Sequence, residues 1–496
     1  MRHRCQPRPR LCTAYAAPQR WHSRRPYPAG KKRDRLWGAG KAVHMPGRRR
    51  PGWFRHLLGG SARARRRRLI LVVIVAVLFS GAAVGAVAGQ GTDRNRAASA
   101  SRGKGPTPPP SAVGVTPSPA PAAPTATAPP SQTPSPANPQ PAWQDMPADI
   151  AAIAEDFLDE QGAAGLAVAV STGSGGTASA RYLTTAGQAA AGTAWTEDTR
   201  SAYRSITKSF VGTVVLQLVG EGRLGLDDPV ARYVPDVAGV ELDGTAAGDR
   251  ITVREALEMR TGLAEFSGTQ EFSDRLDADY TRSFSDSELL GYAFDEPLDF
   301  APGSQYEYSN TNYVLLGEVV RAVTGTPWDQ EVQARVLAPL GLTSVAYSGA
   351  QDPAGPVATP YQTGDSGLES LAQVSPSLYG ASGGYFGNIA DLLTWGRALG
   401  SGQLLPPGLQ SQRLAAVSDP GADNPGSPYY TAYGLAAGEI DGWWGHSGTG
   451  LGYEALTLYN PATGTTVAIL INTQLPNPNG PAILFDRLEG LLADLG

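Results

Sequence analysis

The stretch 106–142 is dominated by Pro, Ala, Ser and Thr, and it divides this chain of 496 residues into parts of different character. Such a composition cannot bury enough apolar surface to build a core. We take the whole of 90–142 as an extended linker, in which the Pro-rich part alone reaches roughly 100 Å at about 3.1 Å per residue. Folding is therefore confined to residues 143–496, which are ample for a large core with an inserted subdomain.

Charge separates the two ends of the chain. Residues 1–68 hold 21 of the 41 Lys and Arg residues but only one acidic residue, Asp34. Residues 143–496 hold 43 acidic residues against 16 basic ones, so the net charge of -4 combines two oppositely charged pieces. Both cysteines, Cys5 and Cys12, lie in the basic piece. The folded part therefore forms no disulfide, and its stability must come from packing.

An uncharged apolar segment, 69–89, directly follows the arginines that end the basic piece. It is long enough to cross a bilayer, and the positive-inside rule then makes 1–68 a disordered cytoplasmic tail with the acidic domain outside. The alternative is a signal cleaved near Ala88, after the small residues Ala86-Val87-Ala88, which a start at Met45 would favour. A basic tail can also bind nucleic acid, but the adjoining apolar span makes membrane orientation the simpler account. The sequence thus predicts a cell-membrane protein with an extracytoplasmic domain, or a secreted one, without a nucleic-acid partner.

Hydrophobic periodicity predicts a sheet that is built from both ends of the domain, with a helical region between them. Strand patterns occur at 165–171, 178–183, 433–439, 454–460 and 465–472. Helical patterns occur at 149–161, 252–259, 285–294, 311–324, 328–340, 388–399 and 481–495. Several of these helices fall within about 230–385, which indicates a mainly helical insertion. We therefore expect an α/β (α+β) fold with a central antiparallel β-sheet flanked by helices.

Lys208 is the one lysine after residue 142, in a region that uses arginine freely for positive charge. Arginine cannot lose its proton in a protein, whereas an amine can be tuned to accept one. Ser205 lies three residues earlier, and residues three apart share a helix face. The apolar run 210–218 indicates a helix packed inside the domain, which would lower the pKa of the amine. The alternative is a solvated lysine beside an accidental serine, but a buried helix favours a nucleophile and its base.

A second group of candidates lies in the motif 306–310, in a predicted loop ahead of a helix. On the motif alone, structural roles carry the same weight as functional ones: Tyr308 would pack in the core, and Asn310 would cap the helix. Near an ammonium group, however, the pKa of Tyr308 would be lowered. Its phenol could then take a proton from a serine and return it to a leaving group. We therefore expect Tyr308 to act together with Ser205 and Lys208.

His446 is the one histidine after residue 142, and it lies between aromatic residues and glycines in the stretch 443–450, ahead of the strand 454–460. A single histidine is more often structural than functional. The flanking glycines alter that interpretation, because they let the backbone of another molecule approach a strand and pair with its edge. His446 and the residues after it, Ser447, Gly448 and Thr449, are therefore candidates for substrate binding.

Three motifs, Ser205-Ile206-Thr207-Lys208, Tyr308-Ser309-Asn310 and His446-Ser447-Gly448, resemble in order and spacing those of the serine beta-lactamase and D-alanyl-D-alanine peptidase superfamily. The chain is similar to its class C beta-lactamase and serine carboxypeptidase branch over 199–234, 251–263, 301–342, 380–399 and 433–472. The resemblance implies a beta-lactamase/transpeptidase-like fold for the domain.

The resemblance also implies a role for each candidate. Ser205 would attack the substrate carbonyl while Lys208 and Tyr308 shuttle its proton. Asn310 would orient the substrate and the lysine. The backbone N–H groups of Ser205 and Thr449 would form the oxyanion hole, and such donors are worth on the order of 3 kcal/mol each. No metal or organic cofactor is implied.

The substrate class stays open, because carboxypeptidases, beta-lactamases, esterases and D-amino-acid amidases share these motifs. His446 stands where lactamases of this branch usually have lysine and where some carboxypeptidases have histidine. Residues 414–486 contain no lysine or arginine to bind the carboxylate of a D-Ala-D-Ala terminus. The hydroxyls of Ser447 and Thr449, protonated His446 or an arginine from the insertion could substitute. Without one of them, an uncharged ester is the better substrate.

We therefore expect an exported serine acyl hydrolase that acts through a Ser205 acyl-enzyme. The first expectation is a D-alanyl-D-alanine carboxypeptidase acting on cell-wall peptides, and the alternatives within the superfamily are an esterase and a beta-lactamase. A domain that binds penicillin or wall peptides without turnover is the alternative outside enzymes. The intact Ser205, Lys208 and Tyr308 stand against it, because a pure binder needs no proton relay.

Overall fold

The computed structural model describes residues 140–347, 356–364, 367–415, 418, 420, 429–477, 479–493 and 495, all of which belong to one compact unit. The predicted basic tail 1–68, the apolar segment 69–89 and the linker as far as residue 139 lie outside the described residues. The membrane location that the sequence suggested is corrected here. In the described part of the chain no helix has both the length and the apolar character needed to cross a bilayer, and the segment behind that prediction is not part of it.

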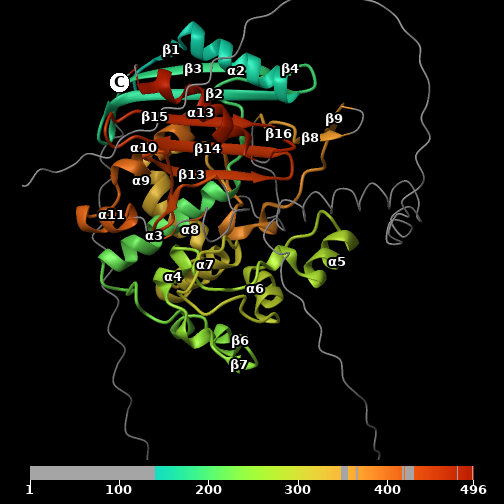
Figure 1. Cartoon of the computed structure of the whole chain (residues 1–496), viewed down its shortest axis with the longest axis vertical. Coiled ribbons are helices and arrows are strands. Elements are labelled where there is room, and N and C mark those ends of the chain that lie inside the picture. The colour runs from blue at the N-terminus through green and yellow to red at the C-terminus, as the bar shows by residue number, and fades with distance from the viewer. Residues whose placement is uncertain are drawn as a thin grey trace, which may run out of the picture. The chain divides into compact units, whose positions relative to one another are not determined.

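A nine-stranded sheet forms the centre of the domain, and both ends of the described chain supply its strands (Figure 1). β1 pairs in parallel with β3, and the other pairs in this sheet are antiparallel, as the sequence predicted. The strand order is β1 (Trp143–Asp145), β3 (Thr177–Ala190), β2 (Gly165–Ser174), β15 (Thr466–Ile471), β14 (Tyr453–Tyr459), β13 (Trp443–Gly450), β12 (Gly438–Ile440) and β11 (Ala432–Tyr433), with β4 (Thr193–Ala194) attached to β3.

Helices cover both faces of this sheet. Side chains alternate between the faces of a strand, and β14 shows which helix lies on which side. Glu454 accepts a hydrogen bond from Gly480 at the start of α13 (Gly480–Ala493), whereas the hydroxyl of Thr457 donates to Leu392 in α10 (Ile389–Ser401). α2 (Ala148–Gln161) packs beside α13. Because both faces are covered, β14 and β15 are buried at every residue.

A mainly helical region lies beyond β13 in Figure 1. Its helices are α3 (Thr207–Gly220), α4 (Val253–Leu257), α5 (Gln270–Ala278), α6 (Asp286–Phe294), α7 (Thr311–Thr324), α8 (Trp328–Val332) and α9 (Ala338–Leu340), with the π-helical turn η7 (Gln333–Leu337) between the last two and α11 (Pro407–Arg413) later in the chain. Short 3-10 turns connect them: η2 (Arg204–Ile206), η3 (Val230–Arg232), η4 (Pro235–Gly239), η5 (Gly248–Arg250), η6 (Phe266–Gly268), η8 (Pro376–Leu378) and η9 (Gly380–Ser382). Small sheets join β5 (Ser201–Ala202) to β10 (Phe386–Gly387), β6 (Glu241–Leu242) to β7 (Thr245–Ala246), and β8 (Tyr361–Gly364) to β9 (Gly367–Ser370) and β16 (Thr473–Gln474).

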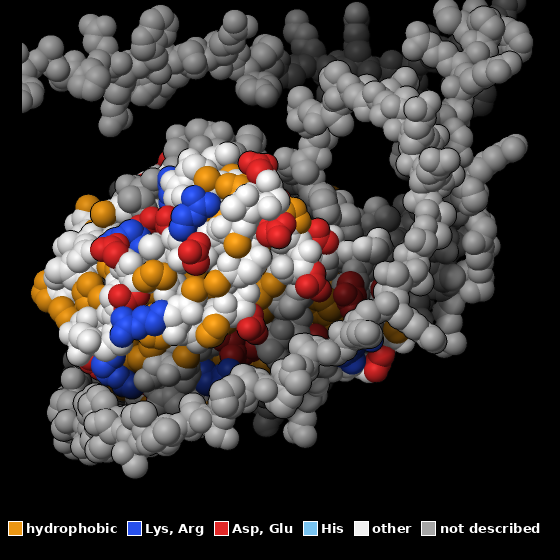
Figure 2. Space-filling model, turned by 90° about the horizontal axis from the view of Figure 1, so that it is seen from below, with side chains coloured by type: hydrophobic (Ala, Val, Ile, Leu, Met, Phe, Trp, Pro, Cys, Tyr) orange, Lys and Arg blue, Asp and Glu red, His pale blue; other side chains and the backbone are white. Residues whose placement is uncertain are grey.

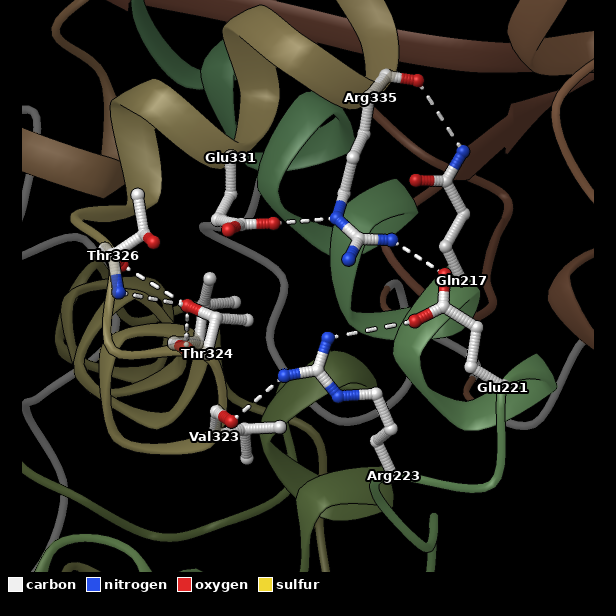
Figure 3. A network of polar contacts seen from close by, with 9 residues as sticks. Gln217, Glu221, Arg223, Val323, Thr324, Thr326, Glu331 and Arg335 are labelled. Carbon is white, nitrogen blue, oxygen red and sulfur yellow. Dashed lines mark hydrogen bonds and ion pairs between the residues drawn. The ribbon is translucent and has the colours of Figure 1, made fainter. Parts of the chain in front are cut away.

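α3 is an interior helix, as its apolar circumference predicted. Every residue from 207 to 216 is buried. Its carboxyl end is fixed by a polar network, in which Arg335 binds both Glu221 and Glu331 while Arg223 donates to the carbonyl of Val323 (Figure 3). This network holds the far end of the helix that carries Lys208 at its start.

Two parts of the sheet differ from the sequence prediction. The predicted strand 433–439 is a hairpin of β11 and β12, which turns through Ala436 at a φ of 61°. Residues 443–450, which the sequence placed ahead of the next strand, form the strand β13 themselves. The glycines of β13 have low β-propensity, so the pattern gave no strand signal there.

The outer surface carries mixed charge. Figure 2 shows acidic and basic side chains interspersed on the face seen from below, rather than gathered into one charged patch. Several arginines are paired with acidic side chains, as in Arg321 with Glu318 and Arg275 with Glu271. On this face, basic side chains are therefore not gathered into a patch of the kind that binds polyanions.

Candidate active site

Ser205 and Lys208 are in direct contact at the start of α3. The amine Nζ lies 3.0 Å from the hydroxyl of Ser205, 2.6 Å from Oδ1 of Asn310 and 2.8 Å from the carbonyl oxygen of Ser382. The lysine is fully buried, and burial lowers the pKa of its amine from 10.5 to about 7, with the charge of Glu265 opposing the shift. A large fraction of this amine is therefore neutral near pH 7.

The partners of the amine also fix the direction of its lone pair. Oδ1 of Asn310 and the carbonyl of Ser382 can only accept, so a neutral amine spends both of its N–H groups on them. Its lone pair then faces the Ser205 hydroxyl, from which it can accept a proton. The arrangement has the geometry of a base directed at a nucleophile.

Asn310 is oriented by a carboxylate that sequence reasoning missed. Its Nδ2 donates to Glu265 at 3.0 Å, and its backbone N–H also donates to Glu265. The carboxylate can only accept, so the amide group must turn Oδ1 toward Lys208. Glu265 lies 45 residues before Asn310 in an unremarkable stretch, and no sequence pattern marks it.

Tyr308 lies beside the amine, with Lys208 Nζ 4.9 Å from the centre of its ring. Its hydroxyl is enclosed and lies near the Ser205 side chain, but it makes no hydrogen bond of regular geometry to the described residues. Burial raises the pKa of Tyr308 well above its ordinary value, the nearby Tyr430 adds to the shift, and the Ser205 side chain opposes it. The expectation that the ammonium would lower this pKa is therefore wrong. With its pKa raised, the phenol favours its protonated form, which leaves the Lys208 amine as the candidate base.

His446 is fully buried between two tyrosines that sequence reasoning also missed. Nδ1 lies 2.6 Å from the carbonyl of Ser447 and 3.0 Å from the hydroxyl of Tyr430, and Nε2 lies 3.1 Å from the hydroxyl of Tyr433. Because a carbonyl only accepts, Nδ1 carries the proton and Nε2 accepts from Tyr433. Burial lowers the pKa of His446 from 6.5 to about 3, and Lys208 adds to the shift. The imidazole is neutral, so it does not supply the positive charge considered for it.

From His446 onward, the edge of β13 opposite β14 is not paired with β12, and this edge lies toward Ser205. β12 pairs only with residues 443–445, whereas β14 pairs with 444–450. On the edge away from β14, the backbone N–H of Ser447 donates to Tyr430 at 2.7 Å. Backbone N–H groups of an antiparallel strand alternate between its edges, so the N–H of Thr449 points to the same edge.

Gly448 brings this edge against the nucleophile. A Cβ at this position would lie 2.2 Å from the carbonyl of Tyr203 and 2.8 Å from the backbone nitrogen of Ser205. Only glycine therefore permits this approach. The contact places the strand segment that carries the Thr449 N–H beside the backbone of Ser205, as an oxyanion hole made of those two donors requires.

The predicted residues thus form two groups, and the contacts described lie within each group. Ser205, Lys208 and Asn310 are joined by direct hydrogen bonds, with Tyr308 beside them. His446 and Ser447 form a second group around Tyr430, whose hydroxyl also contacts Oγ of Ser447 at 2.9 Å. No cluster of three or more His, Cys, Asp or Glu side chains in the described ranges is arranged to hold a metal ion.

Comparison with protein sequences finds a family model described as beta-lactamase, which matches residues 150–491. Esterase EstB from Burkholderia gladioli is 36% identical over 179 residues, which cover 35% of this chain and 44% of the esterase. A protein from Escherichia coli (strain K12), provisionally named a D-alanyl-D-alanine carboxypeptidase, is 31% identical over 145 residues, which cover 29% of this chain and 33% of that protein. The matched part thus spans less than half the length of these curated relatives.

Solved structures agree in fold over the whole domain. A D-stereospecific amidohydrolase from Streptomyces sp. shares 29% sequence identity at a TM-score of 0.58, covering 68% of this chain and 98% of that one. The D-amino acid amidase from Ochrobactrum anthropi SV3 shares 23% identity at a TM-score of 0.59, covering 70% and 98%. At that identity the second likeness concerns the fold alone. The predicted fold class is confirmed.

Proposed function

This chain belongs to the beta-lactamase family and is a serine hydrolase, and we propose that it cleaves uncharged esters or amides through an acyl-enzyme on Ser205. One observation carries the proposal: the buried Lys208 amine lies 3.0 Å from the Ser205 hydroxyl with a pKa of about 7. Burial of an amine costs the protein folding stability through desolvation, and without a chemical role for the amine nothing would offset that cost. Beside a hydroxyl, it activates a nucleophile.

In the proposed acylation, neutral Lys208 takes the proton of Ser205 as its oxygen bonds to the substrate carbonyl carbon. The negative charge that forms on the carbonyl oxygen is bound by the backbone N–H groups of Ser205 and Thr449. Tyr308 gives its phenolic proton to the departing alcohol or amine and is reprotonated by the Lys208 ammonium. A water molecule then hydrolyses the ester on Ser205 by the reverse sequence of proton transfers, which releases the acid and restores the hydroxyl.

The preference for an uncharged substrate is supported by the state of the groups that the sequence offered as partners for a substrate carboxylate. His446 is neutral, because burial lowers its pKa to about 3. The N–H and the hydroxyl of Ser447 are both bound to Tyr430. Of the eight arginines in 230–385, Arg260 donates to the carbonyl of Gly303 and Arg250 is exposed at the end of η5. The other six are paired with carboxylates: Arg232, Arg254, Arg275, Arg282, Arg321 and Arg335. At the edge of β13, the hydroxyl of Thr449 is the group left to bind a free carboxylate on the substrate, since it makes no hydrogen bond within the described part of the chain. One neutral hydroxyl offsets little of the cost of desolvating that charge.

The experiment compares four substrates on the purified full chain: p-nitrophenyl acetate, a D-amino acid amide, an N-acylated D-Ala-D-Ala peptide and a labelled penicillin. We expect the highest kcat/KM for the ester or the amide, with a burst of product and an intact mass that carries one acyl group. Ser205→Ala should abolish both. A D-Ala-D-Ala peptide turned over faster than the ester and amide would make the carboxypeptidase the correct assignment.

Two other outcomes would replace the proposal. Hydrolysis of the penicillin at a rate above that of the ester would identify a beta-lactamase. Stable labelling by the penicillin, without turnover of any ester, amide or peptide, would identify a binding domain. Hydrolysis that persists in Ser205→Ala would remove Ser205 as the nucleophile, whatever the substrate.

A further inference from the structure

Arg204, the residue directly before Ser205, has an unusual backbone conformation. Its φ is 49°, in the left-handed region that glycine occupies without cost and other residues occupy with strain. It is also buried, with 2% of its surface exposed. Glycine would suit this backbone better, and burial of an arginine costs free energy. The side chain must therefore contribute something that offsets both penalties.

The guanidinium of Arg204 is held on several sides. Its Nε donates to the carbonyl of Gly450 at 3.0 Å. Its central carbon lies 5.1 Å from the ring centre of Tyr379, 5.2 Å from that of Tyr453 and 5.8 Å from that of Phe386, which are cation–π distances. The guanidinium is thus enclosed by these groups, with Nη1 left without a hydrogen-bond partner among the described residues.

This side chain connects the two halves of the proposed oxyanion hole. Arg204 is one residue before Ser205, and Gly450 is one residue after Thr449. The two segments are 246 residues apart in sequence, and β13 contacts η2 directly at Gly448. The Arg204 hydrogen bond lies just past that contact, so it limits sliding of the strand end relative to the turn that carries the nucleophile.

We infer that Arg204 is a positioning residue that holds the backbone N–H groups of Ser205 and Thr449 at the separation that an oxyanion requires. This inference rests on the function proposed for Ser205. The donors of an oxyanion hole act because they are fixed in place before charge develops on the substrate oxygen. A small displacement of these donors therefore reduces their binding of the transition state more than their binding of the ground state. Loss of Arg204 should therefore lower kcat and leave KM nearly unchanged.

The test uses Arg204→Gly, Arg204→Met and Arg204→Lys in the full chain, with hydrolysis of p-nitrophenyl acetate as the assay. Arg204→Gly removes the side chain but suits the backbone conformation, so folding is retained. We expect its kcat to fall about 10- to 100-fold, which is less than the loss of a whole oxyanion-hole donor, with KM within about threefold of the wild type. Arg204→Met should lose at least as much. Arg204→Lys, which keeps a cation and one donor, should recover part of the rate.

The matched control is Arg397→Met. Arg397 is another buried arginine that donates to a backbone carbonyl, that of Ser171 in β2. We expect this change to lower the melting temperature but to leave kcat per folded molecule unchanged. An equal fall in kcat for Arg397→Met would show that loss of any buried arginine slows the enzyme, and would overturn the inference.

A second readout does not depend on turnover. Phenylboronic acid bonds reversibly to an active-site serine and forms a tetrahedral boronate, which requires the oxyanion donors in place. Affinity measured by calorimetry should fall by about the same factor as kcat in Arg204→Gly. A folded Arg204→Gly with wild-type kcat and wild-type boronate affinity refutes the positioning role. Absence of ester and amide hydrolysis in the wild type refutes the proposed function instead, while the boronate comparison still decides the role of Arg204.

Discussion

Lys208 and Ser205 are joined by a hydrogen bond of 3.0 Å, and the other two hydrogen bonds of the amine end on oxygens that can only accept. Activity should follow the neutral form of this amine, whose pKa is about 7. We expect kcat/KM to rise with pH around a midpoint near 7 and to fall tenfold per unit well below it. Lys208→Arg keeps the charge but cannot lose a proton, so it should lower kcat by about 10³-fold. A midpoint near 10, or an active Lys208→Arg enzyme, would contradict this role.

Glu265 should set the position of that pH profile. Its negative charge raises the pKa of Lys208 against the effect of burial. Glu265→Gln removes the charge while keeping an acceptor for Asn310, so the pKa of the lysine should fall. The acidic limb of kcat/KM should then move to lower pH, measured between pH 4.5 and 8. Glu288→Gln, which removes a carboxylate paired with Arg282, is the control and should leave the limb in place. A shift to higher pH would disprove the electrostatic account.

Tyr308→Phe should separate activity from stability. The hydroxyl of Tyr308 is enclosed and makes no hydrogen bond of regular geometry to the described residues, so its removal relieves an unsatisfied polar group. We expect the free energy of unfolding to stay the same or to rise by about 1 kcal/mol in urea titrations. The rate should fall by about 10²- to 10³-fold, because the leaving group loses its acid. Tyr292→Phe is the control, since its hydroxyl donates to Glu288 at 2.7 Å; it should lose stability and keep its rate. A Tyr308→Phe enzyme with normal kcat would exclude the phenol from the proton relay.

Gly448→Ala should impair activity through the backbone alone. The added Cβ would lie 2.2 Å from the carbonyl of Tyr203, so β13 must move away from Ser205. We expect kcat to fall by at least about 10²-fold, as for the loss of an oxyanion donor. Gly291→Ala is the matched control, because nothing lies within 4 Å of its added Cβ and Gly291 is inside α6. That change should stabilise the protein by about 0.5–1 kcal/mol and leave kcat unaltered.

Local patterns were sufficient to predict much of this architecture. The helix 311–324 was predicted with the bounds that α7 has, and the sheet is built from both ends of the domain as expected. The predicted contact of Ser205 with Lys208 followed from helical spacing, which is also local. These features depend on periodicity over a few turns, and that information is present in a single sequence.

The parts that were missed depend on contacts between distant segments. Glu265 and the carbonyl of Ser382 reach Lys208 and Asn310 only after folding, and nothing in their neighbourhoods distinguishes them. The direction of the Tyr308 pKa shift was wrong because it depends on how completely the phenol is buried, which a loop motif does not reveal. The left-handed backbone conformation of Arg204 could not be predicted from the sequence either, because arginine is not a residue type that favours it.

His446 should make the stability of the domain depend on pH through its neutral state. Its pKa is about 3 in the folded protein and 6.5 ordinarily, so between these values the unfolded chain binds more protons at this site. The free energy of unfolding should therefore fall as pH drops from 6.5 toward 3, by at most about 1.4 kcal/mol per unit from this residue. His446→Gln keeps one donor and one acceptor but does not titrate. Urea unfolding at pH 7, 6 and 5 should give a shallower decline for the variant than for the wild type, because other groups contribute equally to both. Parallel declines in the two proteins would mean that the pKa of His446 is the same in the folded and unfolded states, and the neutral imidazole bound to Tyr433 would have to be abandoned.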